Sequence, residues 1–220
     1  MSKLNQTLLK FELEQNFAYD DFFVSKCNYF AFSLIETWPK WEKNILNIYG
    51  EKFSGKSHLS EIFKKKNKAL IIKTEEINED FFNKLRFHEN IILDNLEYVS
   101  NEKTLYSLFN FAEQFNKYLI INSIKPINSV DFSLPDLKSR IKNCIFAKIE
   151  KPDDDMIFAL VLKHFSDRQI KIEKKIIEYI TKRIERSYGK ILHFIYKVDQ
   201  FSLVNKKPID YKSIKKILED

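Results

Sequence analysis

The segment GEKFSGKS, residues 50–57, decides the expected fold of this 220-residue chain. It follows the apolar run 45–49, precedes a helix-like stretch and contains two of the chain's three glycines. Glycine lets successive backbone N–H groups turn inward toward phosphate oxygens, lysine adds positive charge near the outer phosphates, and a serine hydroxyl can bind Mg²⁺. The segment therefore predicts a P-loop that binds a nucleotide. The residues expected to form this site are Gly50, Phe53, Ser54, Gly55, Lys56, Ser57 and His58.

The composition indicates a globular chain without a membrane segment. Hydrophobic residues make up 44% of the sequence, enough for one domain with a sizeable core and a small second one. No apolar run approaches the roughly 18 residues of a membrane span, and the N-terminus lacks the features of a signal peptide. We therefore expect a cytoplasmic protein with no membrane partner. Cys27 and Cys144 lack metal-ligand spacing, so each is interpreted as a small buried hydrophobe.

The net charge of +6 comes from lysine-rich runs such as residues 64–68. Lys, Asn, Ile and Phe are abundant together, which is typical of compositional drift in an AT-rich genome. The alternative is a basic surface that contacts nucleic acid. The sequence favours the first interpretation and leaves the second open.

Five short apolar runs alternate with helical stretches, and this alternation predicts a parallel α/β sheet. They cover residues 45–49, 69–73, 90–94, 118–122 and 144–149. Continuous hydrophobicity is typical of strands that helices cover on both faces. The P-loop would then lie at the carboxyl end of the first strand, where open α/β sheets bind ligands.

Beyond residue 150 the pattern becomes helical. Lys151-Pro152 interrupts the strand pattern, and the acidic run 153–155 can cap a helix. Helices are expected over residues 154–166, 173–185, 189–204 and 210–218. The predicted organisation is a tail over residues 1–20, a nucleotide-binding core over 21–151 and a small all-α lid domain over 152–220.

The segment NIILDNLE, residues 90–97, delivers Asp94 at the end of the third predicted strand. A carboxylate there can hold the water shell of a Mg²⁺ ion that Ser57 ligates, although a strand-ending aspartate is also commonly a turn or helix cap. Its position after a P-loop favours a Walker B motif, with Ser57 and Asp94 as the magnesium site. The next residue is Asn95, and an amide is a poor general base. Glu97 is either a substitute base or a solvated loop carboxylate.

The P-loop, the Walker B motif and the helical segment after the sheet resemble the AAA+ superfamily. Two further segments narrow the resemblance to the bacterial initiator DnaA and its smaller relatives. DDFFVSKCNYFAFSLI, residues 20–35, is similar to that group's adenine-side segment, and SLPDLKSRI, residues 133–141, to its arginine-finger motif. The resemblance implies an α/β AAA+ core, with a five-stranded parallel sheet flanked by helices, and a small all-α lid. It also implies that Arg140 faces a neighbouring subunit's nucleotide; without the motif, Arg140 would be interpreted as a surface arginine.

The resemblance implies two sensor positions as well. Asn122, after the fourth predicted strand, stands at the first. Lys190 stands at the second, where the family has an arginine, so the charge is kept but the bidentate fork is lost. Together with Asn95, these residues imply a chain that retains ADP or ATP with Mg²⁺ and hydrolyses ATP slowly by itself.

The N-terminal segment QTLLKF, residues 6–11, is similar in degraded form to the peptide by which partners dock on the bacterial sliding clamp. Gln6, Leu9 and Phe11 match that peptide and Thr7 does not. A frayed amphipathic tail is the alternative interpretation. Because the last predicted lid helix ends near Asp220, no helix-turn-helix domain for reading DNA is expected after it. With ETWPKW at residues 36–41, these features resemble the alphaproteobacterial form of the regulatory inactivators of DnaA, the Hda group.

The resemblance thus implies a regulator of replication initiation that is nucleotide-bound, tethered to the clamp, and uses Arg140 in trans to promote hydrolysis of DnaA-bound ATP. Its expected partners are DnaA and the sliding clamp, with DNA contacted indirectly through the clamp and homo-oligomer formation left open. Two other functions remain: a self-sufficient ATPase that loads or remodels a DNA-bound assembly, and a nucleotide-stabilised adaptor without a role in hydrolysis. Asn95 argues against the first, and the sequence LKSR at residues 137–140 argues against the second.

Overall fold

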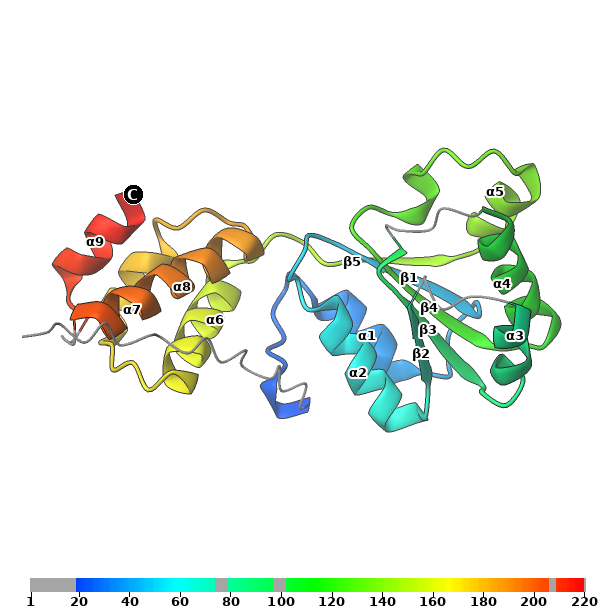
Figure 1. Ribbon diagram of the computed structural model, residues 1–220, viewed down its shortest axis with the longest axis horizontal. Coiled ribbons are helices and arrows are strands. Elements are labelled where there is room, and N and C mark those ends of the chain that lie inside the picture. The colour runs from blue at the N-terminus through cyan, green and yellow to red at the C-terminus, as the bar shows by residue number, and fades with distance from the viewer. Residues whose placement is uncertain (1–18, 74–78, 97–101, 206–208, 220) are drawn as a thin grey trace, which may run out of the picture.

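The computed structural model describes residues 19–73, 79–96, 102–205 and 209–219. Its core is a parallel five-stranded sheet with the strand order β2-β3-β4-β1-β5 (Figure 1). The strands are β1 (Ile45–Tyr49), β2 (Leu70–Lys73), β3 (Asn90–Asp94), β4 (Tyr118–Ser123) and β5 (Ile145–Lys148). The predicted sheet is confirmed, and every strand boundary lies within one residue of the expected position.

Helices cover both faces of the sheet (Figure 1). Helices α1 (Tyr29–Thr37) and α2 (Lys56–Asn67) pack on the face that carries Leu46, Ile48 and Ile92. The opposite face, which carries Ile45, Ile91 and Leu93, is covered by α3 (Glu79–Leu85), α4 (Glu102–Gln114) and α5 (Pro135–Ile141). Successive strand residues therefore alternate between two buried apolar layers, which explains the continuous hydrophobicity of the strands. Short 3-10 turns occupy Tyr19–Asp21 and Ile127–Ser129.

A helical bundle follows the last strand, and we use this name for α6 (Asp154–Asp167), α7 (Lys174–Thr181), α8 (Tyr188–Asn205) and α9 (Tyr211–Glu219). The bundle has its own apolar core, which includes Phe165, Ile180 and Ile195. Asp153 begins it as expected, because its side chain accepts a hydrogen bond of 2.8 Å from the Met156 N–H and so caps α6.

Helix α7 ends earlier than predicted, at Thr181 instead of Glu185. The N–H groups of Arg183 and Ile184 both bond to the carbonyl of Ile180, so the chain tightens into a turn. After this turn, α8 begins beside the P-loop, where Ser187 and Tyr188 donate hydrogen bonds to the carboxylate of Glu51. A tertiary contact has therefore set a boundary that local periodicity placed later.

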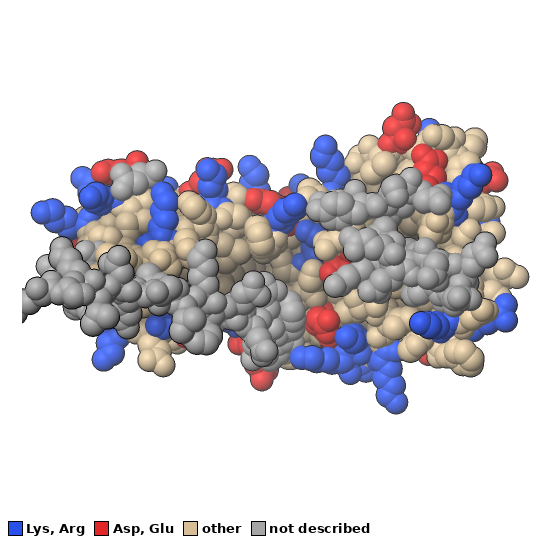
Figure 2. All heavy atoms as spheres, viewed as in Figure 1, with Lys and Arg blue, Asp and Glu red and all other residues tan. Residues whose placement is uncertain are grey.

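Three features that the sequence analysis took from the composition can be compared with the structure: membrane-spanning helices, surface charge and the two cysteines. In the described ranges, no helix combines the length and apolar character that crossing a bilayer requires. On the face in Figure 2, basic and acidic side chains are interspersed over the molecule. Cys27 and Cys144 are both buried, and burial raises the pKa of the Cys144 thiol to about 12. Their interpretation as small buried hydrophobes is confirmed.

Candidate nucleotide site and arginine finger

The P-loop turns directly after β1 in a conformation that its glycines permit. A Cβ atom at Gly50 would lie 2.8 Å from the carbonyl oxygen of Ile149, so a larger residue has no room there. Gly55 has φ +94°, in the left-handed region that side chains disfavour. Phe53 also has a positive φ of 65°, and its ring is 64% exposed. The loop geometry is thus the tight turn that the sequence predicted.

Lys56 begins α2 and folds back over the loop. Its ammonium group donates to the carbonyl oxygens of Gly50 and Glu51 at 2.8 and 2.9 Å, and only 8% of the residue is exposed. Within the described chain, the buried hydroxyl oxygen of Ser54 has no hydrogen-bond partner. A phosphate oxygen could satisfy the Ser54 hydroxyl, because burial leaves this polar group in need of a partner, and the charge of Lys56 would lie beside it. The loop therefore fits a nucleotide phosphate.

Three predicted site residues meet at the carboxyl ends of β3 and β4. The Ser57 hydroxyl donates to Asp94 Oδ2 at 3.1 Å, and Asn122 Nδ2 donates to Asp94 Oδ1 at 2.8 Å. The same amide group donates to Ser60 Oγ at 2.7 Å. In the described chain Asn122 Oδ1 is buried without a partner. A hydroxyl and a carboxylate at this separation suit Mg²⁺ that also binds phosphate oxygens and water, since Mg²⁺ prefers oxygen ligands.

The segment that precedes the sheet contributes aromatic rings beside the P-loop. The Phe22 ring lies 3.2 Å from the Cβ position of Gly55, stacks on Phe32 and meets the His58 ring edge-on at 5.1 Å between centroids. His58 therefore contacts the adenine-side segment instead of pointing away from it. An apolar, aromatic surface next to a phosphate loop suits a purine base.

Glu51, which the sequence analysis did not single out, links the P-loop to the helical bundle. Its carboxylate accepts a short hydrogen bond from the Ser187 hydroxyl and a 3.3 Å bond from the Tyr188 N–H. It therefore caps the N-terminus of α8, where a negative charge is favourable. Ser187 lies 136 residues away in sequence, and no local signal connects the two.

Lys190 lies in the first turn of α8 but does not contact the phosphate loop. Its ammonium group is 4.0 Å from Glu185, and its side chain is 63% exposed. The preceding Gly189 does lie beside the loop, since its Cβ position is 3.8 Å from Glu51 and 4.0 Å from the Phe53 ring. The structure thus places the backbone of this sensor position next to the loop and its ammonium group with Glu185.

Arg140 lies on α5, which leads into the amino end of β5, whereas the P-loop lies at the carboxyl end of the neighbouring strand β1. The two strands run parallel. A strand of this length spans roughly 15 Å, so Arg140 cannot reach its own P-loop. Glu102 fixes the start of α5 by accepting the N–H groups of Ser133 and Leu134, and these bonds lower the pKa of its carboxyl group.

The guanidinium group of Arg140 is turned toward its own chain. It forms an ion pair with Glu113 on α4 and lies 5.5 Å from the centre of the Tyr106 ring. Its side chain is 26% exposed. The resemblance implied a guanidinium aimed outward at a neighbour, and the structure differs because an acid and an aromatic ring on α4 bind it.

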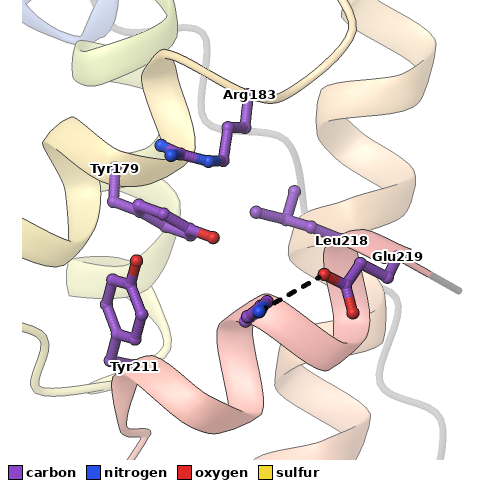
Figure 3. A pocket seen from close by; sticks show the side chains of 6 residues that line it. Tyr179, Arg183, Tyr211, Leu218 and Glu219 are labelled. Atoms are coloured by element: carbon purple, nitrogen blue, oxygen red, sulfur yellow. Dashed lines mark ion pairs between the residues drawn. The ribbon is translucent and has the colours of Figure 1, made fainter.

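Asn95 directly follows β3 with φ 58°. Gln6, Leu9, Phe11 and Glu97 lie outside the described residues. A hollow of about 400 Å³ lies in the helical bundle, where the guanidinium of Arg183 stacks 3.9 Å over Tyr179, and Tyr211 lies below that ring (Figure 3). Lys215 and Glu219 pair with each other at its edge.

Comparison with known proteins places this architecture among DnaA-like AAA+ folds. No model of a known protein family matches the chain. The chain is 22% identical over 234 positions to the chromosomal replication initiator protein DnaA of Cutibacterium acnes, covering 94% of this chain and 47% of that protein. It is 23% identical to DnaA of Caldanaerobacter subterraneus, covering 98% of this chain and 55% of that one. The chain spans about half the length of these curated relatives.

The solved structures give the same answer for the fold. Domain III of the Thermotoga maritima replication initiation protein DnaA superposes with a TM-score of 0.76 at 19% identity, covering 93% of this chain and 96% of that one. AMPPCP-bound DnaA from Aquifex aeolicus gives a TM-score of 0.69 at 17% identity, covering 89% of this chain and 66% of that chain. The AAA+ fold expected from the sequence is confirmed.

Proposed function

We propose that the chain binds ADP or ATP with Mg²⁺ at the P-loop. Support comes from the tight glycine turn, the buried Lys56 ammonium group and the cluster of Ser57, Asp94 and Asn122. The DnaA of Aquifex aeolicus with the same fold binds AMPPCP, an ATP analogue, in its solved structure. Backbone N–H groups and Lys56 would hold the phosphates, Ser57 and Asp94 would hold the ion, and the ring of Phe22 would lie near the base.

In this proposal the nucleotide is mainly a structural and regulatory ligand. A water molecule that attacks the outer phosphate needs a group to orient and deprotonate it, and Asn95 offers only an amide after β3. Hydrolysis by the chain alone is therefore slow. The nucleotide would instead stabilise the core and fix the position of the helical bundle, which acts as the lid.

The chain is further proposed to act on DnaA as a regulator of replication initiation, held near DNA by a clamp-binding peptide that includes Gln6, Leu9 and Phe11. Arg140 supplies positive charge to ATP bound by DnaA. The observation that supports this step is the position of Arg140 at the amino ends of the strands, opposite the carboxyl ends where its own P-loop lies. A finger at the amino ends of the strands can serve a neighbour's nucleotide and not its own, and such a group accelerates hydrolysis by about 10³ to 10⁵.

The test is single-turnover hydrolysis of ATP bound to DnaA, with and without this chain and DNA-loaded clamp. The wild-type chain should stimulate hydrolysis, Arg140→Ala should lose the stimulation, and Arg140→Lys should not restore it, because an ammonium group lacks the planar fork. Equal stimulation by Arg140→Ala would favour the adaptor. Rapid turnover by the chain alone, abolished by Asp94→Asn, would favour the self-sufficient ATPase.

A further inference from the structure

Arg140 has two partners on α4 that occupy it in the free chain. The carboxylate of Glu113 pairs with its guanidinium, and the Tyr106 ring lies 5.5 Å from the guanidinium carbon. Both partners come from one helix, and Tyr106 packs against the apolar core beneath α4 and α5. The guanidinium is therefore bound in a defined place instead of moving freely in solvent.

Binding by Glu113 competes with the role of a finger. A guanidinium group presents its N–H donors in one plane, and a carboxylate takes the same edge that a phosphate would take. Glu113 and a partner's phosphate are alternative anions for one cation. Arg140 must leave Glu113, at least in part, before it can stabilise charge on a neighbouring nucleotide.

The exposure of the pair makes this exchange feasible. The side chains of Arg140 and Glu113 are 26% and 39% exposed, so neither charge is sealed inside the protein. Transfer from one anion to another keeps the guanidinium charge compensated throughout. An exposed pair of this kind is weak, and loss of the carboxylate should shift the equilibrium only a few-fold.

We propose that Glu113 and Tyr106 are positioning residues that hold Arg140 at rest, and that the phosphates of a partner's bound nucleotide displace Glu113 from the guanidinium. This proposal rests on the proposed trans function of Arg140. In the free chain, Glu113 therefore occupies the guanidinium group of Arg140. The guanidinium leaves Glu113 only when the phosphates of a partner's nucleotide, which carry more negative charge, are in contact with it.

The test separates the apparent affinity of the chain for its partner from the maximal rate. DnaA loaded with ATP is titrated with wild-type chain, Glu113→Gln and the control Asp131→Asn, at DNA-loaded clamp. Asp131 pairs with Lys138 on the same helix as Arg140, so the control makes the same change in charge. Glu113→Gln should lower the half-maximal concentration about two- to five-fold without reducing the plateau rate.

A second measurement uses the free chain alone. In ¹⁵N-labelled protein, the side-chain N–H groups of Arg140 should exchange with solvent a few-fold more slowly in the wild type than in Glu113→Gln, because the ion pair is weak and partly exposed. Tyr106→Leu should shift the half-maximal concentration in the same direction by a smaller factor, and it replaces Glu113→Gln if that variant does not fold.

The outcomes separate this proposal from the function on which it rests. Arg140→Ala that stimulates as well as wild type overturns the proposed function. Suppose that Arg140→Ala is inactive but Glu113→Gln has the same half-maximal concentration as Asp131→Asn, or a lower plateau rate. The trans function of Arg140 is then supported, and the proposed role of Glu113 is wrong. Exchange at Arg140 that is as fast in the free wild-type chain as in Glu113→Gln also contradicts the proposed role of Glu113.

Discussion

Lys56 shows how a single charged group can serve both the free and the nucleotide-bound chain. Its ammonium group now satisfies the carbonyls of Gly50 and Glu51, and phosphate oxygens would take over part of that role. Lys56→Ala should lower the free energy of unfolding of the free chain by about 1 to 2 kcal/mol, since two hydrogen bonds are lost. It should also remove the stabilisation by nucleotide, about 2.7 kcal/mol for a ligand at a hundred times its Kd.

Thermal unfolding with and without ADP and Mg²⁺ measures both effects. Lys52→Ala is the control, because Lys52 lies in the same loop with an exposed side chain. A shift with nucleotide that is as large in Lys56→Ala as in wild type would mean that the loop does not hold phosphate.

Asp94 provides a separate test of the ion. Its carboxylate accepts from Ser57 through Oδ2 and from Asn122 through Oδ1; an asparagine could still accept from Asn122 through its amide oxygen, and its NH2 group could donate to the Ser57 hydroxyl. Asp94→Asn should therefore leave the fold intact but remove the gain in nucleotide affinity on adding Mg²⁺. Titration with a fluorescent ADP analogue, in Mg²⁺ and in chelator, gives this ratio. A ratio equal to that of wild type would place the ion elsewhere.

Among individual residues, the sequence predicted the site members that are close together along the chain and those that directly follow a strand of the sheet. Lys56 and Ser57 follow from loop spacing, and Asp94 follows from the end of an apolar strand. Asn122 required the family resemblance, and its contact with Asp94 agrees with that position. The pairs Glu51–Ser187 and Arg140–Glu113 could not be predicted, since each joins ordinary polar residues that only tertiary packing brings together.

Helix α6 contains a histidine whose charge state should affect the bundle. Burial is the main cause that lowers the pKa of His164, and the neighbouring Arg168 and Lys163 lower it further, while Asp167 opposes them. The folded chain therefore keeps His164 neutral to a lower pH than the unfolded chain does. As pH falls below the ordinary value near 6.5, the unfolded state binds the proton more readily, so stability falls.

The expected result is a difference between wild type and His164→Gln that depends on pH. The free energy of unfolding of wild type should fall faster from pH 7.5 to 5.5 than that of the variant, by at most about 1.4 kcal/mol per pH unit. Urea unfolding across this range measures the slope. Parallel slopes for the two proteins would show that His164 has the same pKa in both states.

Elements were predicted best where one physical pattern dominates. The central strands β1, β3 and β4 are largely buried, the edge strands β2 and β5 are partly buried, and all five carry apolar runs whose boundaries agree within one residue. The predicted C-terminus of α7 is wrong because the helical pattern of the sequence continues beyond Thr181, whereas the chain turns there so that α8 can contact Glu51. Local patterns locate elements, and tertiary contacts decide where some of them end.

For the whole molecule, a small set of polar contacts joins the sheet core to the helical bundle. The Tyr188 hydroxyl donates to the carbonyl of Glu150, and the Cys27 N–H donates to Asp153. Lys163 on α6 pairs with Asp21 at 2.6 Å. Burial is the main cause that raises the pKa of Tyr188, so its hydroxyl remains a neutral donor at physiological pH. We propose that the domain boundary lies near residue 151, between Glu150 and Asp153, which make two of these contacts.

Glu51 is the contact that couples this junction to the P-loop, because one carboxylate joins the loop to the N-terminus of α8. Glu51→Ala should remove a helix cap worth about 1 kcal/mol, which corresponds to an opening equilibrium about five-fold larger. When opening is fast relative to cleavage, proteolysis follows that equilibrium. Brief digestion with endoproteinase Asp-N, which cuts on the amino side of aspartate, should therefore cut before Asp153 about five-fold faster in Glu51→Ala than in wild type.

Mass spectrometry of the fragments identifies the site, which separates opening of the junction from general unfolding. Glu185→Ala is the matched control, since it removes a carboxylate near the start of α8 that pairs with Lys190 and does not cap the helix. Equal cleavage before Asp153 in the two variants would show that Glu51 does not hold the bundle on the core. Faster cleavage confined to Glu51→Ala, and slowed by added nucleotide, would show that the loop and the bundle move as one unit because a single acid connects them.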